Sequence, residues 1–156
     1  MKEKLTIILF SGEMDKALAA FTLATAAAAG GMEVTIFFTF WGLNLLKKKR
    51  LAINKTQNIF QRLFNVFSTS KLPVSKLNMF GLGSGIMRRI MKKSGMASLN
   101  ELMNLAGELK VKYVACSTSC GVLGLKETDL IDSVAEFAGA AYYISEAKNS
   151  KINLFI

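Results

Sequence analysis

The stretch that decides the fold is residues 4–40, KLTIILFSGEMDKALAAFTLATAAAAGGMEVTIFFTF. It begins with a short apolar run at residues 4–10 and ends with a second at residues 34–40, and both are typical of buried strands. Between them, residues 13–29 repeat their apolar side chains with the helical period, and Gly30-Gly31 ends the helix. Strand, helix and strand in this order predict a βαβ unit, and hence a parallel sheet with a right-handed crossover.

The same region also allows a membrane interpretation, because Glu33 is the only charged residue between Ala17 and Leu46. A helix needs about 20 consecutive apolar residues to cross a bilayer. The segment Gly30–Glu33 divides the run into two pieces of 13 residues each. Both pieces are short for a span, and the second begins with strand-forming residues. We therefore favour a buried soluble βαβ core over a transmembrane pair.

The second half of the chain repeats the alternation of strands and helices. Helices are expected at residues 98–110, where Ser98 and Glu101 form a capping-box pattern, and at 139–148. Residues 117–124 are turn-rich with a possible short helix, and residues 130–134 are helix or turn. Further strands are expected at residues 112–115, 135–137 and 151–156. The sum predicts one domain over residues 1–156, a flavodoxin-like three-layer α/β/α sandwich with a mainly parallel five-stranded sheet.

A long insert separates the second strand from the third, at about residues 43–97. We expect a helix start at 42–50, helical spacing at 59–67, a loop at 71–85 and a helix at 86–91. The glycines at positions 81, 83 and 85 match neither the Rossmann nor the P-loop pattern, so they indicate a flexible loop. Connections of this length usually form lids or interface elements.

The net charge of +9 comes from the insert. Twelve of the 20 basic residues lie between Lys47 and Lys93, and no acidic residue occurs between Glu33 and Glu101. Such a segment permits contact with nucleic acid or a membrane surface, but a solvated face is the usual reason for a charge run. Its aromatic residues also have the helical spacing of a core or an interface. We predict no nucleic-acid partner, do not favour membrane-surface contact, and expect the insert near the Cys116 mouth or at a subunit interface.

Two features of the composition exclude whole classes of chemistry. The chain has no histidine, which excludes Ser-His-Asp and Cys-His catalysis and histidine metal sites. It has only two cysteines, too few for a secreted disulfide scaffold or a zinc site. No secretory leader pattern is visible, so we expect a cytoplasmic protein. We also expect neither a metal nor a cofactor.

Cys116 is the strongest candidate for chemistry, because it ends a predicted strand. Ligand sites in parallel sheets lie beyond the carboxyl ends of the strands, where Cys116 would meet residues 11–12 and 39–42. Backbone N–H groups of residues 117–121 and nearby cations would stabilise a thiolate, which is a nucleophile and can carry sulfur as a persulfide. A buried structural cysteine is the alternative.

Cys120 follows Cys116 at a spacing that places both sulfurs on one face if the stretch is helical. It could be a resolving thiol or a second sulfur-relay site. We favour a small apolar core residue over both.

Three stretches resemble the DsrE/DsrF-like sulfur-transfer proteins, in particular the long-insert branch sometimes called peroxiredoxin-like. They are FFTFWGL at residues 37–43, NMFG at residues 78–81, and Ala115-Cys116 followed by Ser119, Gly124 and Leu125. The resemblance covers essentially the whole chain. A Pro-x-x-x-Thr-x-x-Cys pattern is absent, so the residues do not support peroxiredoxin chemistry.

The resemblance implies a DsrE-like fold and a sulfur carrier. In such proteins the cysteine at the position of Cys116 takes up sulfane sulfur as a persulfide and exchanges it with TusA-like or rhodanese-like partners. Family members are usually oligomers, which implies a homo-oligomer here, a trimer or a hexamer. Cys120 departs from the family pattern and allows a Cys116–Cys120 disulfide or a two-thiol relay.

We therefore expect a sulfurtransferase or sulfur carrier whose nucleophile is Cys116, with Cys120 as a weaker candidate. The expected pocket consists of Ser117, Thr118, Ser119, Gly121, Thr39, Trp41 and Gly42. Two alternatives stay open. One is a non-catalytic oligomeric interaction subunit, suggested by the Met- and Phe-rich insert. The other is a thiol redox switch between Cys116 and Cys120.

Overall fold

The computed structural model describes residues 2–48 and 82–156. Its centre is a five-stranded sheet in the order β4-β3-β2-β1-β5, in which every neighbouring pair is parallel. The strands are β1 (Lys4–Leu9), β2 (Glu33–Phe38), β3 (Lys112–Cys116), β4 (Val134–Ala138) and β5 (Ile152–Phe155). The predicted parallel five-stranded sheet is confirmed.

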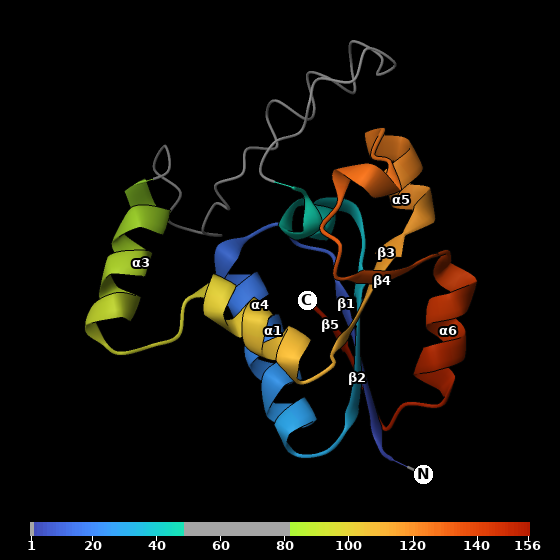
Figure 1. The fold of residues 1–156 in the computed structure, drawn as a ribbon, viewed down its shortest axis with the longest axis horizontal. Coiled ribbons are helices and arrows are strands. Elements are labelled where there is room, and N and C mark those ends of the chain that lie inside the picture. The colour runs from blue at the N-terminus through green and yellow to red at the C-terminus, as the bar shows by residue number, and fades with distance from the viewer. Residues whose placement is uncertain (1, 49–81) are drawn as a thin grey trace.

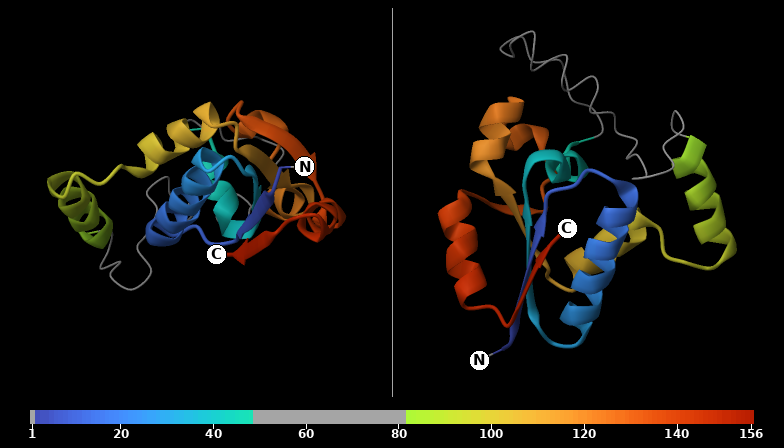
Figure 2. Two further views of the ribbon diagram at one scale, coloured as in Figure 1. Left: turned by 90° about the horizontal axis from the view of Figure 1, so that it is seen from below. Right: turned by 180° about the vertical axis from the view of Figure 1, so that it is seen from behind.

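Helices cover both faces of the sheet (Figures 1 and 2). α1 (Met14–Ala29) and α4 (Leu99–Glu108) lie on one face, and α6 (Ala140–Lys148) lies on the other. The short helix α5 (Ser117–Leu123) continues from the carboxyl end of β3. The remaining helices are the 3-10 segments η1 (Phe40–Leu46) and η3 (Glu127–Asp129) and the helix α3 (Leu82–Lys93). The α/β sandwich expected from the alternation is therefore the observed architecture.

Two hydrophobic clusters fill the space between the layers. The larger lies under α1 and α4 and includes Phe21, Phe38 and Tyr113, whose rings meet at centroid distances of 5.5–6.3 Å. The smaller lies under α6 and consists of Phe37, Val114 and Cys116, with Ala138, Tyr142 and Tyr143 packed against them. Side chains alternate between the two faces along a strand, so β3 contributes Tyr113 and Ala115 to one cluster and Val114 and Cys116 to the other.

The apolar region from Ala17 to Leu46 is divided among α1, β2 and η1. The βαβ interpretation is thus confirmed. Across the described ranges, none of the helices combines the length and the hydropathy needed to cross a membrane.

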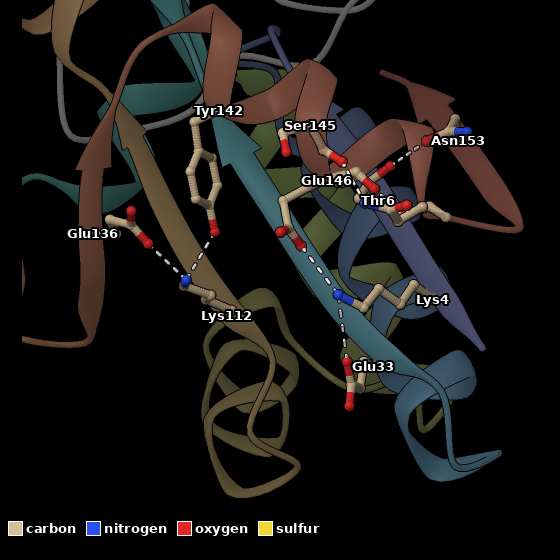
Figure 3. A network of polar contacts seen from close by, with 11 residues as sticks. Lys4, Thr6, Glu33, Lys112, Glu136, Tyr142, Ser145, Glu146 and Asn153 are labelled. Atoms are coloured by element: carbon tan, nitrogen blue, oxygen red, sulfur yellow. Dashed lines mark hydrogen bonds and ion pairs between the residues drawn. The ribbon is translucent and has the colours of Figure 1, made fainter. Parts of the chain in front are cut away.

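Polar contacts attach α6 to the sheet on the other side from α1 (Figure 3). Lys4 lies 3.7 Å from the carboxylates of both Glu33 and Glu146. Lys112 Nζ donates to Glu136 at 2.6 Å and to the Tyr142 hydroxyl at 2.8 Å, and Thr6 donates to Asn153. The contacts of Lys4 with Glu146 and of Lys112 with Tyr142 hold α6 over the small cluster that contains Cys116.

Several boundaries differ from the sequence prediction. The second strand ends at Phe38 rather than Phe40, and the helix expected from residue 42 is the 3-10 segment Phe40–Leu46. A helix or turn was predicted at residues 130–134. The structure has its 3-10 turn earlier, at Glu127–Asp129, and Val134 is already the first residue of β4. The capping box is present, since Ser98 Oγ accepts from the Glu101 N–H and Glu101 accepts from the Ser98 N–H.

The predicted loop at 71–85 is wrong at its end, because α3 already begins at Leu82. Glycines at positions 83 and 85 lie inside this helix, where each costs about 1 kcal/mol relative to alanine and does not by itself end the helix. The helical pattern at 59–67 and the NMFG stretch at 78–81 lie outside the described residues.

Candidate functional site

The site begins where β1 and β2 leave the sheet side by side. The Gly42 N–H donates to the Phe10 carbonyl at 2.9 Å, and a Cβ on Gly42 would lie 2.0 Å from the Leu9 carbonyl oxygen. A Cβ on Gly12 would lie 2.8 Å from the Trp41 carbonyl oxygen. Only glycine allows these two backbones to approach so closely. This contact determines where Thr39 lies, just before η1.

Cys116 is the last residue of β3 and the N-cap residue of α5. Its side chain is 6 % exposed and packs in the small cluster under α6. The next two residues, Ser117 and Thr118, are exposed. The sulfur therefore lies just below the surface at the carboxyl edge of the sheet.

The surroundings of Cys116 favour its thiolate. Burial raises the pKa of Cys116, but hydrogen bonds from the Ser119 hydroxyl and N–H, the Thr39 hydroxyl and the Thr118 N–H outweigh it, and the pKa falls below the ordinary value. Thr39 Oγ1 and Ser119 Oγ are 2.8 Å apart. Thr39, which directly follows β2, and Ser119 of α5 therefore meet at this sulfur. Within the described ranges, every group that lowers this pKa is neutral, whereas the sequence suggested that cations could contribute.

Cys120 has a different environment on the same helix. It is buried in the large cluster with Leu123, Leu125 and Leu130. Burial raises its pKa to about 11; the charges of Cys116 and Glu127 add to this, and Lys47 opposes it. Both cysteines are free. The helix starts at Ser117, after Cys116, and the two thiols pack in different clusters.

Lys47 is a neighbour of both Cys120 and Asp129 that the sequence analysis did not single out. Burial lowers the pKa of Lys47, while Asp129 and Cys120 act in the opposite direction. The Lys48 N–H donates to the Asp129 carbonyl at 2.9 Å, and the Ile131 N–H donates to the Leu46 carbonyl at 2.8 Å. The basic segment thus starts beside the loop that follows α5. About 80 residues separate these partners along the chain, so no local pattern could reveal the contact.

The other expected pocket residues have different positions. Trp41 is partly exposed beside Phe40, which adopts a positive φ of 44°. Gly121 is exposed on α5, and a Cβ there would meet nothing within 4 Å. Ser119, Thr118 and Thr39 are therefore the expected residues that contact the sulfur. In the part of the chain that is described, no three acidic or cysteine side chains gather as metal ligands would.

Fold and site together define a class: a parallel α/β protein with a low-pKa thiol at the carboxyl edge of its sheet. The model of the DsrE/DsrF/DrsH-like family matches residues 1–155, and the chain belongs to this family.

Two relatives match over nearly their full length. The chain is 40 % identical to the YrkE protein of Bacillus subtilis over 157 residues, covering 99 % of this chain and 97 % of the relative. It is 38 % identical over 163 residues to the sulfur carrier protein DsrE2 of Allochromatium vinosum, covering 99 % of each.

Two solved structures share the fold at low identity. The ychN protein of E. coli has a TM-score of 0.55 at 11 % identity and covers 99 % of each chain. MTH1491 of Methanobacterium thermoautotrophicum has a TM-score of 0.56 at 9 % identity, covering 99 % of this chain and 100 % of that one.

The hydrogen bonds at Cys116 lead to a pH prediction. In the wild type, the alkylation rate of Cys116 should rise with pH through an inflection below the ordinary thiol pKa, because only the thiolate reacts. Ser119→Ala removes one donor and should move the inflection to higher pH. Iodoacetamide labelling followed by peptide mass spectrometry measures it. The exposed Ser117→Ala is the matched control and should leave the inflection in place; equal profiles for all three proteins would contradict the assignment.

Proposed function

We propose that this protein is a sulfur carrier that holds sulfane sulfur as a persulfide on Cys116. The observation that carries the proposal is the environment of this thiol. It is a shallowly buried sulfur whose pKa is lowered by hydroxyl and N–H donors, so its anion needs no histidine. A persulfide anion at the same position would meet the same donors.

The chemistry is an exchange between sulfur atoms. The Cys116 thiolate attacks the outer sulfur of a donor persulfide, a new S–S bond forms, and the donor's own S–S bond breaks. The donor leaves as a thiolate, and Cys116 carries the persulfide. An acceptor thiolate then attacks the terminal sulfur and restores the Cys116 thiolate. Each step moves one sulfur atom and one electron pair, so no external oxidant or reductant takes part.

Family membership and the relative described as a sulfur carrier support this role. Within the proposal, the donor and acceptor are sulfur-carrier proteins of the TusA-like or rhodanese-like kind. The working unit is a homo-oligomer, a trimer or a hexamer, in the cytoplasm. These finer assignments follow from the family resemblance and are part of the proposal.

A carrier must release its sulfur as well as accept it. The protein loaded with a small persulfide and freed of excess donor should lose one sulfur atom when mixed with an acceptor protein thiol. The acceptor should gain that atom, because the terminal sulfur is the electrophile in the second step. Intact-protein mass spectrometry of both partners gives the balance. Attack on the inner sulfur would instead release sulfide and join Cys116 to the acceptor in a mixed disulfide, and that outcome would argue against a relay.

The low exposure of Cys116 favours a second candidate, a non-catalytic interaction subunit. In that case Cys116 would resist alkylation in the folded oligomer at every pH up to unfolding. A redox switch would instead yield a Cys116–Cys120 disulfide under mild oxidation.

A further inference from the structure

The helix α3 is set apart from the rest of the fold. All views in Figures 1 and 2 show it beside the body, joined to α4 by an extended connection. Two of its large aliphatic side chains face solvent, since Ile86 is 60 % exposed and Ile90 is 56 % exposed. They are one helical turn apart and therefore form a continuous apolar ridge.

Positive charge borders this ridge. Arg89 and Lys93 are also one turn apart, and each lies three positions from an isoleucine of the ridge, so the two rows run side by side. Both side chains are exposed, as is Lys92. None of the ion pairs between described residues involves these three cations. The nearest acidic residues along the sequence are Glu33 and Glu101.

The end of α3 adds a third apolar side chain. Gly95 adopts a φ of +67°, its N–H donates to the Lys92 carbonyl, and the Met96 N–H donates to the Met91 carbonyl at 3.0 Å. This is the Schellman arrangement, which stops the helix at a defined residue. Met91 is buried, whereas Met96 is 61 % exposed. The terminus therefore holds Met96 in solvent directly after the helix.

The charge run alone did not favour membrane-surface contact, but the structure adds an exposed aliphatic ridge beside the cations. We propose that α3 is a membrane-surface helix that lies in the interface of an anionic lipid bilayer. Ile86 and Ile90 enter the boundary of the acyl chains, while Arg89 and Lys93 contact anionic headgroups. An exposed aliphatic ridge with a row of cations along one side fits this environment, because a bilayer offers an apolar interior and negative charge along the whole length of the helix. A protein partner would need a groove shaped for the ridge together with acids placed beside it. The proposal goes beyond sulfur transfer and is independent of it.

Flotation with lipid vesicles tests this surface on the full chain. The wild type should bind vesicles of phosphatidylcholine mixed with phosphatidylserine and should not bind phosphatidylcholine alone. Ile86→Ser with Ile90→Ser should weaken binding at least about tenfold, because the apolar contact is lost. Arg89→Glu with Lys93→Glu should weaken it at least about tenfold through charge reversal. Ile144→Ser, at a 64 % exposed position on α6, is the matched control and should bind as the wild type does.

Other outcomes would overturn the proposal. Absence of wild-type binding to the anionic vesicles would do so, as would unchanged binding of the Ile86/Ile90 variant. Loss of binding in the charge variant alone would indicate simple electrostatic attraction without insertion. A change of oligomeric state in the Ile86/Ile90 variant, with no lipid binding by the wild type, would assign the ridge to an interface between copies. Sulfur uptake at Cys116 should be equal in all variants. A negative result in the vesicle experiment would therefore leave the sulfur-carrier proposal unaffected.

Discussion

Replacing Cys116 with serine is expected to abolish the uptake of sulfane sulfur, with a fall in rate of at least about a thousandfold. Serine has nearly the same shape, but its hydroxyl is not ionised near neutral pH and cannot form the S–S bond that a persulfide requires. The donors at Ser119 and Thr39 would remain in place. Intact-protein mass spectrometry during incubation with a persulfide donor measures the uptake.

Cys120→Ala is the matched control for this variant. The Cys120 thiol is buried and its pKa is about 11, so it is almost entirely protonated near neutral pH. Its removal should leave the first uptake of sulfur nearly unchanged. Equal loss in both variants would instead indicate a two-thiol relay, and full uptake by Cys116→Ser would remove Cys116 from the mechanism.

Gly42→Ala is expected to be the most destabilising single methyl addition at the site, at about 3 kcal/mol or more. The new Cβ would lie 2.0 Å from the Leu9 carbonyl oxygen, a backbone atom that cannot move without displacing β1. The hydrogen bond from the Gly42 N–H to Phe10 would be strained as well. Urea unfolding followed by circular dichroism measures the loss as a lower midpoint.

Gly107→Ala supplies the opposite expectation within the same chain. Gly107 lies in α4, is exposed, and a Cβ there meets nothing within 4 Å. Alanine should stabilise this helix by about 0.5–1 kcal/mol, since glycine is the poorer helix former. If both substitutions shifted the urea midpoint upward, the close approach of β1 and η1 described above would be wrong.

Much of the fold could be predicted because its strands are short and apolar. Continuous runs such as VTIFFTF are typical of strands covered on both faces, and the parallel sheet follows from their alternation with helices. The position of Cys116 at a strand end followed from the same pattern. The two clusters on either side of β3 required only the alternation of side chains, once the strand was known.

The electrostatics of the site could not be predicted in the same way. Ser119 and Thr39 are 80 residues apart, and their 2.8 Å contact depends on how η1 and α5 meet above the sheet. The neutral groups that lower the pKa of Cys116 replace the cations suggested by the charge of the insert. Cys116 and Cys120 pack in different clusters. Cys116 is the N-cap residue of α5 and not part of its first turn, which the spacing of the two cysteines could not predict.

In the insert, the spacing of apolar residues predicted a helix but not whether its side chains are buried. The spacing of Met87, Ile90 and Met91 predicted a helix over residues 86–91 correctly, and apolar side chains at such a spacing usually lie in a core. In the structure Met91 is buried but Ile86 and Ile90 are exposed, and α3 lies apart from the sheet and its helices (Figure 2). The loop predicted up to residue 85 relied on glycine as a helix breaker, but α3 includes both Gly83 and Gly85, since a single glycine only weakens a helix.

The central claim is that sulfur resides on Cys116, and one measurement addresses it most directly. The wild-type protein is loaded with a persulfide donor, alkylated without reduction and digested with trypsin, which leaves both cysteines in residues 113–126. Fragmentation of this peptide in the mass spectrometer separates the two thiols. The account predicts one additional sulfur atom on Cys116 and none on Cys120. An additional sulfur found only on Cys120, or none in a protein whose Cys116 is freely alkylated, would contradict it.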